Sequence, residues 1–342
     1  MKNKLPVLDK KLISNKKVFL RLDLDVPIIN GEIKDETRLI AGLKTLQFLL
    51  NYSSKIIICG HLGRPIGFDK NFSLKPVAEW FRDKLKVQSS KFKNERMGEF
   101  LGWEIGEKIF LLENIRFYEE EERSDKKFSK KLAHLADIYV NDAFAASHRN
   151  HASIAGVPKY LTHFAGFNLE NEIKNLSLVF ENPMRPLTVI IGGAKIETKL
   201  PLVEKMDKIA DSILIGGKIA LEKNKIKTKD NKVYIAVLNK EEMDINQDDI
   251  SFFKKIINRS RMIIWNGPVG KIEEKEYQKG TEKVARAIIQ TKVFSIVGGG
   301  DTIDFINKIG LINKFSFIST GGGAMLSFLS GEKLPGIEVL KT

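Results

Sequence analysis

Short apolar runs rich in β-branched residues alternate with amphipathic helical stretches along the chain, and this alternation limits the possible folds more than any other feature. The strand-like runs are Val18–Leu24, Lys55–Cys59, Ile109–Leu112, Ile138–Val140, Thr188–Ile191, Ser212–Ile215, Met262–Trp265, Val293–Val297 and Ser316–Ser319. The helical patterns between them are Thr37–Leu50, Leu74–Lys84, Phe128–Ala136, Thr198–Ile209 and Thr281–Gln290. Strands that alternate with helices form mainly parallel sheets covered by helices. We therefore predict an α/β protein.

A long helical pattern, Leu169–Phe180, separates the first four strand-like runs from the last five. At roughly 150 residues per domain, a chain of 342 residues is long enough for two domains. We predict a first domain over residues 1–165, a connecting helix within 166–183 and a second domain over 184–327.

Composition excludes several classes of protein. The longest apolar run, Val233–Leu238, is too short for a helix that spans a bilayer. The single cysteine, Cys59, excludes an internal disulfide and is typical of a reducing compartment. The formal net charge of +13 is compatible with nucleic acid or with small anionic substrates, but the lysines are scattered apart from a cluster over residues 218–232. We expect a cytoplasmic protein that binds neither membranes nor nucleic acid.

Basic residues follow the strand-like runs of the first half. In parallel sheets, ligands bind outside the carboxyl ends of the strands. Alternation within residues 18–26 places Arg21, Asp23 and Asp25 on one face, where we predict that they line a wet cleft because three charges are costly in a core. The basic residues at or near the strand ends are Arg21, Arg38, His61, Arg64, Arg116 and Arg149. Each alone is compatible with a local salt bridge, but together they indicate a small ligand with two or more anionic groups.

Two histidines and an aspartate near residue 150 raise the alternative of a metal site. His148, His151 and Asp142 are ligand types that metals accept. Arg149 lies between the histidines, where its charge opposes a cation, and no HExxH pattern is present. We therefore expect structural or substrate-contacting histidines.

Glycine-rich turns follow all five strand-like runs of the second half, in the segments IIGGAKIETK, LIGGKIA, IIWNGPVG, IVGGGDT and ISTGGGA. Glycine at a strand-to-helix turn lets backbone N–H groups approach a phosphate, and the helix N-terminus adds its positive dipole end. With Lys195, Lys199 and Asp301 beside these turns, the pattern predicts a polyphosphate site with Mg²⁺. The P-loop and dinucleotide fingerprints are absent. The residues thus predict a two-domain kinase for a small anionic molecule.

At these same residues the sequence resembles the phosphoglycerate kinases. The resemblance is carried by RLDLDVP, GEIKDETR, HLGRP, SLKPVAE, LLENIRFYEEEE, VNDAFAASHRNHAS, GGAKIETK, WNGPVG, SIVGGGDT and FSFISTGGGAMLSFLSGEKLPGIEVL, in the family's order. It implies a monomeric glycolytic enzyme that transfers a phosphoryl group between 1,3-bisphosphoglycerate and ADP, with Mg²⁺. It further implies two Rossmann-like lobes joined by a hinge helix, with segment 328–342 returning to the N-terminal, phosphoglycerate-binding lobe.

The resemblance also implies residue roles. The substrate-binding positions that match are Arg21, Asp23, Asp25, Arg38, His61, Arg64, Arg116 and Arg149. The nucleotide-binding positions that match are Gly193, Ala194, Lys195, Lys199, Gly217, Asn266, Gly267, Glu273, Gly299, Gly300, Asp301 and Thr302. Asp301 is the expected magnesium ligand. The residues expected to act on the transferring group are Arg38, Lys199, Gly299 and Gly322.

Three departures from the family pattern affect these expectations. Asp25 stands where the family has asparagine, and Lys218 stands where it has glycine. Only 48 positions separate Gly217 from Trp265, so much of the usual adenine-pocket wall is missing. We therefore expect nucleotide binding dominated by the phosphates, unless residues 218–238 fold over the base and enclose it by another route.

Two other functions remain open from the sequence. The missing segment and Asp25 are compatible with a degenerate, non-catalytic nucleotide-binding or regulatory homologue. The net charge leaves nucleic-acid binding as a third alternative. Retention of every matched phosphate-handling position favours the kinase.

Overall fold

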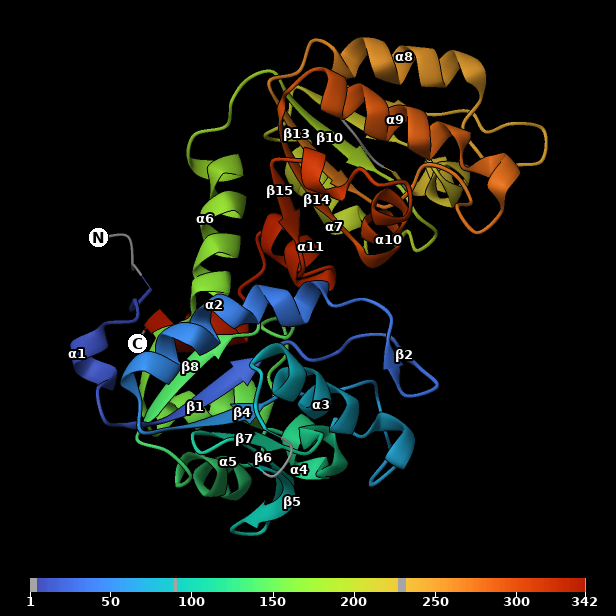
Figure 1. The fold of residues 1–342 in the computed structure, drawn as a ribbon. Coiled ribbons are helices and arrows are strands. Elements are labelled where there is room, and N and C mark those ends of the chain that lie inside the picture. Colours follow the sequence, from blue (N-terminus) through green and yellow to red (C-terminus); the bar gives the residue numbers. More distant parts are fainter. Residues whose placement is uncertain (1–4, 89–90, 227–231, 342) are drawn as a thin grey trace. The chain divides into compact units, whose positions relative to one another are not determined.

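A computed structural model describes residues 5–88, 91–226 and 232–341. It consists of two compact units, Met1–Glu172 together with Lys333–Thr342, and Ile173–Glu332, which can be followed by colour in Figure 1. The boundary between the units lies inside helix α6 (Phe167–Glu181). Both units are α/β, as the alternation of strands and helices predicts. Within the described ranges, no helix is long and apolar enough to cross a membrane.

The first unit is built on a seven-stranded sheet with the strand order β5-β6-β7-β4-β1-β8-β9. The strands are β1 (Lys17–Leu22), β4 (Lys55–Cys59), β5 (Phe92–Met97), β6 (Phe100–Ile105), β7 (Ile109–Leu112), β8 (Ile138–Asp142) and β9 (Thr162–Ala165). The four strands predicted for this half are confirmed as β1, β4, β7 and β8, which pair in parallel through β7-β4-β1-β8. Their carboxyl ends therefore lie at one edge of the sheet.

The β5-β6 edge of this sheet was not predicted. β5 and β6 pair antiparallel with each other, and β6 pairs antiparallel with β7. β5 reads FKNERM and is exposed over its central four residues, so it lacks the apolar run on which the prediction depended. A parallel sheet with an antiparallel edge is a common arrangement. A separate short hairpin, β2 (Ile28–Ile29) with β3 (Glu32–Ile33), follows β1.

Helices cover both faces of the first sheet. α2 (Thr37–Tyr52) and α3 (Lys75–Lys84) share one hydrophobic core with Leu20 and Leu22 of β1, and α5 (Lys126–Ala133) lies across the opposite face (Figure 1). Because side chains alternate along a strand, Phe19 and Arg21 point to the face without α2, where Phe19 stacks on Tyr139. The shorter helical elements are α1 (Lys10–Ile13), η1 (Lys70–Phe72), η3 (Ile115–Phe117), α4 (Glu119–Glu122), the π-helix η4 (Ala152–Gly156), η5 (Val157–Lys159), α12 (Pro335–Glu338) and η9 (Val339–Lys341).

The second unit is built on a six-stranded sheet with the order β12-β11-β10-β13-β14-β15, in which every pair is parallel. The strands are β10 (Leu187–Ile191), β11 (Ser212–Ile215), β12 (Val233–Ile235), β13 (Met262–Asn266), β14 (Phe294–Gly298) and β15 (Phe317–Ser319). All five predicted strands of this half are confirmed, and the start of the apolar run Val233–Leu238 forms a sixth strand, β12, at the edge of the sheet. The glycine-rich turns thus follow adjacent strand ends.

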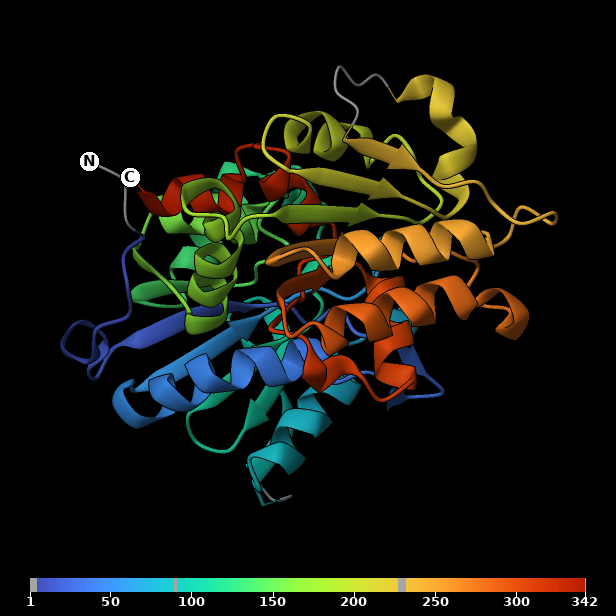
Figure 2. The same cartoon turned by 90° about the horizontal axis from the view of Figure 1, so that it is seen from above.

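The helices of the second unit are α7 (Leu200–Met206), α8 (Gln247–Ile257), α9 (Lys279–Gln290), α10 (Gly300–Lys308) and α11 (Gly323–Leu329), with the short turns η6 (Lys218–Lys225), η7 (Lys275–Tyr277) and η8 (Ile312–Lys314). α8 and α9 lie side by side (Figure 2) and pack in one core with Trp265. α8 was not predicted, although the Asn246 side chain caps it through the Asp249 N–H. α7 is shorter than the predicted 198–209, so Lys199 precedes the helix at its N-cap.

Candidate active site

Arg21, at the end of β1, is completely buried, so the prediction that it lines a wet cleft is wrong. Its Nε–H donates to Ser153 Oγ at 2.9 Å, and one terminal nitrogen donates to the carbonyl of Leu22. The other terminal nitrogen lies 3.0 Å from His61 Nδ1. These acceptors compensate for the water that a buried guanidinium loses. Only the tertiary contacts make this charged residue tolerable inside the unit.

The contact with Arg21 determines the tautomer of His61. A guanidinium can only donate, so His61 Nδ1 must be the acceptor and the ring proton resides on Nε2. Burial and the neighbouring charges of Arg21 and Arg116 hold the pKa of His61 well below its usual range. The imidazole is therefore neutral at pH 7 and presents Nε2–H as a donor.

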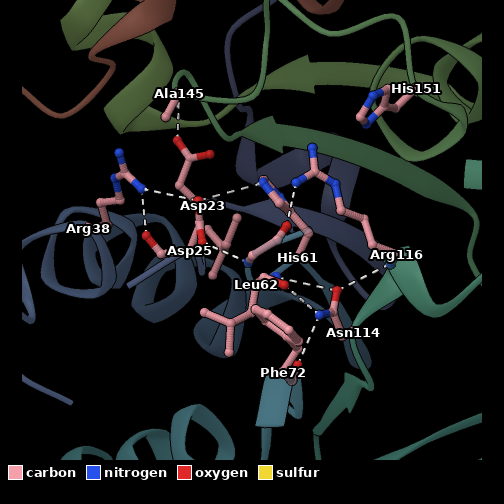
Figure 3. A network of polar contacts seen from close by, with 12 residues as sticks. Asp23, Asp25, Arg38, His61, Leu62, Phe72, Asn114, Arg116, Ala145 and His151 are labelled. Carbon is pink, nitrogen blue, oxygen red and sulfur yellow. Dashed lines mark hydrogen bonds and ion pairs between the residues drawn. The ribbon is translucent and has the colours of Figure 1, made fainter. Parts of the chain in front are cut away.

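Asp25 lies between Arg38 and His61, as Figure 3 shows. Arg38, in the first turn of α2, donates to the Asp25 backbone carbonyl at 2.5 Å, and its Nη1 lies 3.8 Å from Asp25 Oδ2. The same oxygen is 4.0 Å from His61 Nε2, and Oδ1 accepts the Gly63 N–H at 2.9 Å. The Asp25 carboxylate, at a position where the resemblance implies an asparagine, is thus offset by a neighbouring arginine and anchors the turn after β4.

Asp23 is buried nearby and holds a different segment. Its Oδ2 accepts the Ala145 N–H at 2.7 Å, and its Oδ1 has no hydrogen-bond partner among the described residues. Burial raises the pKa of Asp23, while the charges of Arg38 and Arg21 oppose that rise. Asp23 therefore connects the end of β1 to the loop after β8.

The turn that carries His61 is held by Asn114 and Arg116 (Figure 3). Asn114 Nδ2 donates to the carbonyls of Leu62 at 2.7 Å and Phe72 at 2.9 Å. Arg116 Nη1 donates to the Gly63 carbonyl at 2.6 Å, and its Nε lies 3.0 Å from Glu122 Oε1. The strand ends of β1, β4 and β7 thus bring Arg21, Asp25, Arg38, His61 and Arg116 into one connected cluster, the anion cluster.

The remaining predicted residues of this unit are less tightly held. Arg64 is exposed and Arg149 is half-buried. His151 lies 3.8 Å from Glu121, and burial beside Arg116 and Arg21 lowers the pKa of His151 to about 3. No group of three or more His, Cys, Asp or Glu suited to a metal occurs in the ranges the structure describes. Asp142 instead accepts the Leu169 N–H at 2.9 Å near the start of α6, and burial raises the pKa of Asp142 to about 7.

In the second unit, Lys199 and Asn266 form the polar centre of the strand ends. Lys199 is buried, and its Nζ donates to Asn266 Oδ1 at the end of β13. Burial lowers the pKa of Lys199 to about 8, although Asp301 acts in the opposite direction. The amine therefore retains its proton at pH 7 but lies close to the point at which it would lose it.

Two glycines make the close backbone approach around this centre possible. At Gly267 (φ +94°) an added Cβ would lie 2.2 Å from the Gly192 carbonyl oxygen. The Gly267 N–H donates to Thr302 Oγ1 at 3.0 Å, which connects β13 to α10. Gly299 (φ +98°) is the N-cap of α10. These positions need backbone conformations that other residues rarely adopt.

A cavity of about 410 Å³ lies beside these strand ends. The predicted residues that line it are Gly193, Ala194, Gly217, Glu273 and Asp301. Other predicted residues do not line the cavity. Lys195 and Gly300 are exposed, and Gly322 (φ +39°) is the N-cap of α11. Asp301 lies in the first turn of α10, and Gly299 rather than Asp301 is the N-cap of that helix.

The sequence did not predict several lining residues, which are Lys218, Leu221, Glu241, Glu242, Met243, Pro268, Gly270 and Lys271. Leu221 comes from η6, inside the shortened connection, and residues 227–231 of that connection lie outside the described ranges. A wall is thus present despite the missing segment, and part of it comes from residues 241–243, beyond the 218–238 stretch that the alternative prediction considered.

The turn over residues 239–244 is held by its own polar side chains. Asn239 Oδ1 accepts the N–H groups of Met243 at 2.9 Å and Asp244 at 3.2 Å. The buried Asp244 carboxylate accepts the Gly280 N–H at 2.7 Å, and burial raises the pKa of Asp244 to about 6. The Met243 carbonyl accepts the Lys271 N–H at 2.7 Å. A polar run such as NKEEMD is typical of any turn, so only the fold identifies it as a pocket wall.

Comparison with known proteins gives a consistent result. The sequence profile of the family described as phosphoglycerate kinase matches residues 8–233 and 222–332. A phosphoglycerate kinase of Wolbachia pipientis subsp. Culex pipiens (strain wPip) is 39% identical over 379 aligned residues, which cover 94% of this chain and 96% of the relative. That of Finegoldia magna is 37% identical, with coverages of 96% and 97%. The alignment with the Wolbachia protein is longer than this chain of 342 residues, so that relative contains segments absent here.

Solved structures agree with the sequence relatives. Phosphoglycerate kinase from Coxiella burnetii matches with a TM-score of 0.78 and 30% identity, and the match covers 96% of each chain. The enzyme from Pyrococcus horikoshii OT3 matches with the same TM-score, identity and coverage. The two segments of the profile match overlap at residues 222–233, within the connection that the sequence identifies as shortened.

Proposed function

Because the chain belongs to the phosphoglycerate kinase family, we propose that its first unit binds the phosphoglycerate and its second unit binds the nucleotide. The enzyme is a phosphotransferase with a carboxyl group as acceptor. It transfers a phosphoryl group reversibly between 1,3-bisphosphoglycerate and ADP to give 3-phosphoglycerate and ATP. The observation that most supports the division of roles is the anion cluster, in which three arginines and a neutral histidine lie around the strand ends of one unit.

On the phosphoglycerate side, each group of the anion cluster has a distinct capacity. Arg21 and Arg116 are held in place by protein acceptors and supply fixed positive charge. His61 offers Nε2–H as a neutral donor. Arg38 is partly exposed, so its guanidinium has room to contact the transferring phosphoryl group. Arg64 and Arg149, with Asp23 and Asp25, complete the proposed substrate site.

On the nucleotide side, the phosphates are proposed to bind where β10, β13 and β14 end. Lys199 supplies a buried cation, and the turn at Gly299 leads into α10, whose first backbone N–H groups can approach a phosphate. Asn266 and Thr302 fix these segments to one another through Lys199 and Gly267. Further proposed nucleotide contacts are Ala194, Lys195, Gly217, Glu273, Gly300 and Gly322.

The reaction needs no general base, because a carboxylate or a phosphate oxygen is already deprotonated at neutral pH. Catalysis therefore depends on in-line positioning and on stabilisation of charge on the transferring group. We propose that a monomer closes by a hinge movement that brings Arg38 and Lys199 to the same phosphoryl group. Closure also excludes water, which would otherwise hydrolyse the acyl phosphate. Such an enzyme acts in the cytoplasm.

The residues present fit a magnesium ion only in combination with nucleotide phosphates. No cage of three acidic or imidazole ligands occurs in the part of the chain that the structure describes, but Asp301 is exposed and lines the cavity. Mg²⁺ commonly binds through one or two carboxylates together with substrate phosphates. We propose that Asp301 holds Mg²⁺ in this way, and the ion then supplies charge neutralisation for the phosphates.

Replacing Asp301 by alanine should raise the Mg²⁺ concentration needed for half-maximal ADP binding by about tenfold, because the loss of one ligand is of the order of 1.4 kcal/mol. Calorimetric titration of ADP at a series of Mg²⁺ concentrations measures this shift. Asp304, also in α10, provides a control in the Asp304→Ala variant. Unchanged metal dependence in Asp301→Ala would show that the carboxylate has no metal role.

The function is tested by a coupled assay in both directions, with ADP and GDP compared side by side. We expect turnover with both, and Kd values that differ by less than about tenfold, because Glu241, Glu242 and Lys271 in the cavity wall are exposed, so that water can reach the edges of a bound base. Absence of turnover in either direction would favour the non-catalytic homologue. A preference for ADP beyond about a hundredfold, or 2.7 kcal/mol, would mean that the wall built from Leu221 and 241–243 reads the base.

A further inference from the structure

One glutamate behind the anion cluster is buried while its neighbours are exposed. Glu121 belongs to the run of four glutamates that forms α4, and it alone in that run has no exposed surface. A buried carboxylate is costly unless it is hydrogen-bonded, so its partners are informative. Both of its oxygens bind the same residue: Oε2 accepts the Ser153 N–H at 2.8 Å and Oε1 accepts the Ser153 hydroxyl at 2.6 Å.

The hydroxyl of Ser153 transmits this contact to the anion cluster. A serine hydroxyl has one proton, and here that proton is donated to Glu121. Its lone pairs are then free to accept the Nε–H of Arg21 at 2.9 Å. Arg21 in turn donates to His61 Nδ1 at 3.0 Å, which leaves the ring proton on Nε2. Glu121, Ser153, Arg21 and His61 thus form one continuous chain of hydrogen bonds, in which the donor and the acceptor of each bond are fixed.

We propose that Glu121 and Ser153 are positioning residues for the phosphoglycerate site, because they orient the guanidinium of Arg21 and, through it, the proton-bearing nitrogen of His61. The inference rests on the proposed roles of Arg21 and His61 in substrate binding. Ser153 and Arg21 are both completely buried, so bulk water cannot replace the hydroxyl as the acceptor for Nε–H.

The local backbone supports this assignment. Ser153 lies in the single π-helical turn η4, which directs both its N–H and its hydroxyl to one carboxylate. Single π turns are frequently found at functional sites. A purely structural role would need only the bond from the backbone N–H, whereas the bond from the hydroxyl is the one that reaches Arg21. The two bonds can be separated by mutation.

The test compares Glu121→Gln, Ser153→Ala and the double variant by calorimetric titration with 3-phosphoglycerate. In Glu121→Gln the amide can still accept the Ser153 N–H, but the hydroxyl loses its obligatory acceptor. Each single change should weaken the Kd for 3-phosphoglycerate by about tenfold, as expected for one bond to a charged group. The double variant should bind no more weakly than Ser153→Ala, because both changes break one link. Losses of binding free energy that add in the double variant would contradict the proposal that Glu121 and Ser153 act through the same chain of hydrogen bonds.

The exposed Glu120→Gln in the same run is the matched control and should leave the Kd unchanged. ADP binding should be unaffected in every variant. Nitrogen-15 NMR of His61 provides a second readout, since the ring should be Nε2-protonated in the native chain and lose that single tautomer in Ser153→Ala. If Glu121→Gln does not fold, Ser153→Ala with its NMR spectrum decides, because it keeps every carboxylate. An unchanged Kd together with an unchanged tautomer would contradict the proposal.

An Arg21→Met variant separates this inference from the proposed function. If Arg21→Met leaves the Kd for 3-phosphoglycerate unchanged, the proposed substrate site is wrong, and so is the proposed positioning role of Glu121 and Ser153. If Arg21→Met weakens binding while Glu121→Gln and Ser153→Ala do not, the proposed substrate site is supported and only the positioning role of Glu121 and Ser153 is wrong.

Discussion

Replacement of Arg38 by alanine should lower kcat by about a thousandfold, the scale on which an arginine stabilises a transferring phosphoryl group. Arg38 is tied to the backbone of Asp25 but keeps part of its guanidinium exposed, so it is positioned without being enclosed. Because the contact proposed for Arg38 is with the transition state rather than with the bound nucleotide, the Kd for ADP should stay near the native value. Steady-state kinetics with calorimetry of ADP binding measures both quantities.

Two further variants sharpen this experiment. Arg38→Lys keeps the charge but loses the planar fork, and should recover only part of kcat. Arg82→Ala, on α3, removes an arginine that pairs with the exposed Asp83 and should behave like the native enzyme. A native kcat in Arg38→Ala would exclude the assigned role.

Lys199→Met should lower kcat/KM by at least about a hundredfold, since one preorganised donor to a developing charge is removed from a buried position. The same change should stabilise the folded chain. Burial lowers the pKa of Lys199 from 10.5 to about 8, which corresponds to a cost of at most about 3 kcal/mol for keeping the amine charged at pH 7. Thermal unfolding and kinetics of the same sample test both statements, and Lys208→Met, an exposed lysine, is the control.

The pH dependence of the native chain follows from the same pKa. Between about pH 8 and pH 10.5 the unfolded chain binds more protons at Lys199 than the folded chain does, so this group makes stability rise with pH in that window. Nucleotide phosphates favour the charged amine, so ADP binding near pH 8.5 should take up a proton. Lys199→Met should abolish both effects, as shown by calorimetry in buffers of different ionisation enthalpy. Proton uptake that persists in Lys199→Met would assign the titration to another group.

Local sequence patterns were enough to predict much of the fold and many residues of the candidate site. The nine strong strands were predicted from apolar runs, because buried parallel strands need continuous β-branched residues. The edge strand β5 was missed because its exposed residues have no such requirement. Likewise, glycines at strand ends mark positions such as Gly267, where a side chain would collide with backbone.

The sequence by itself determined which residue types stand at the strand ends, and from these it predicts an anion site in one half and a glycine-rich phosphate site in the other. Only the tertiary structure decided how these residues are held. Arg21 donates to Ser153, which lies 132 positions away. With this contact Arg21 is buried, whereas the sequence predicts it in a solvent-filled cleft. Residues 241–243 line the cavity of the second unit because Asp244 anchors their turn to Gly280, 36 positions further on. Periodicity reports how a residue relates to its own strand or helix, whereas hydrogen bonds between distant segments arise only when the whole chain has folded.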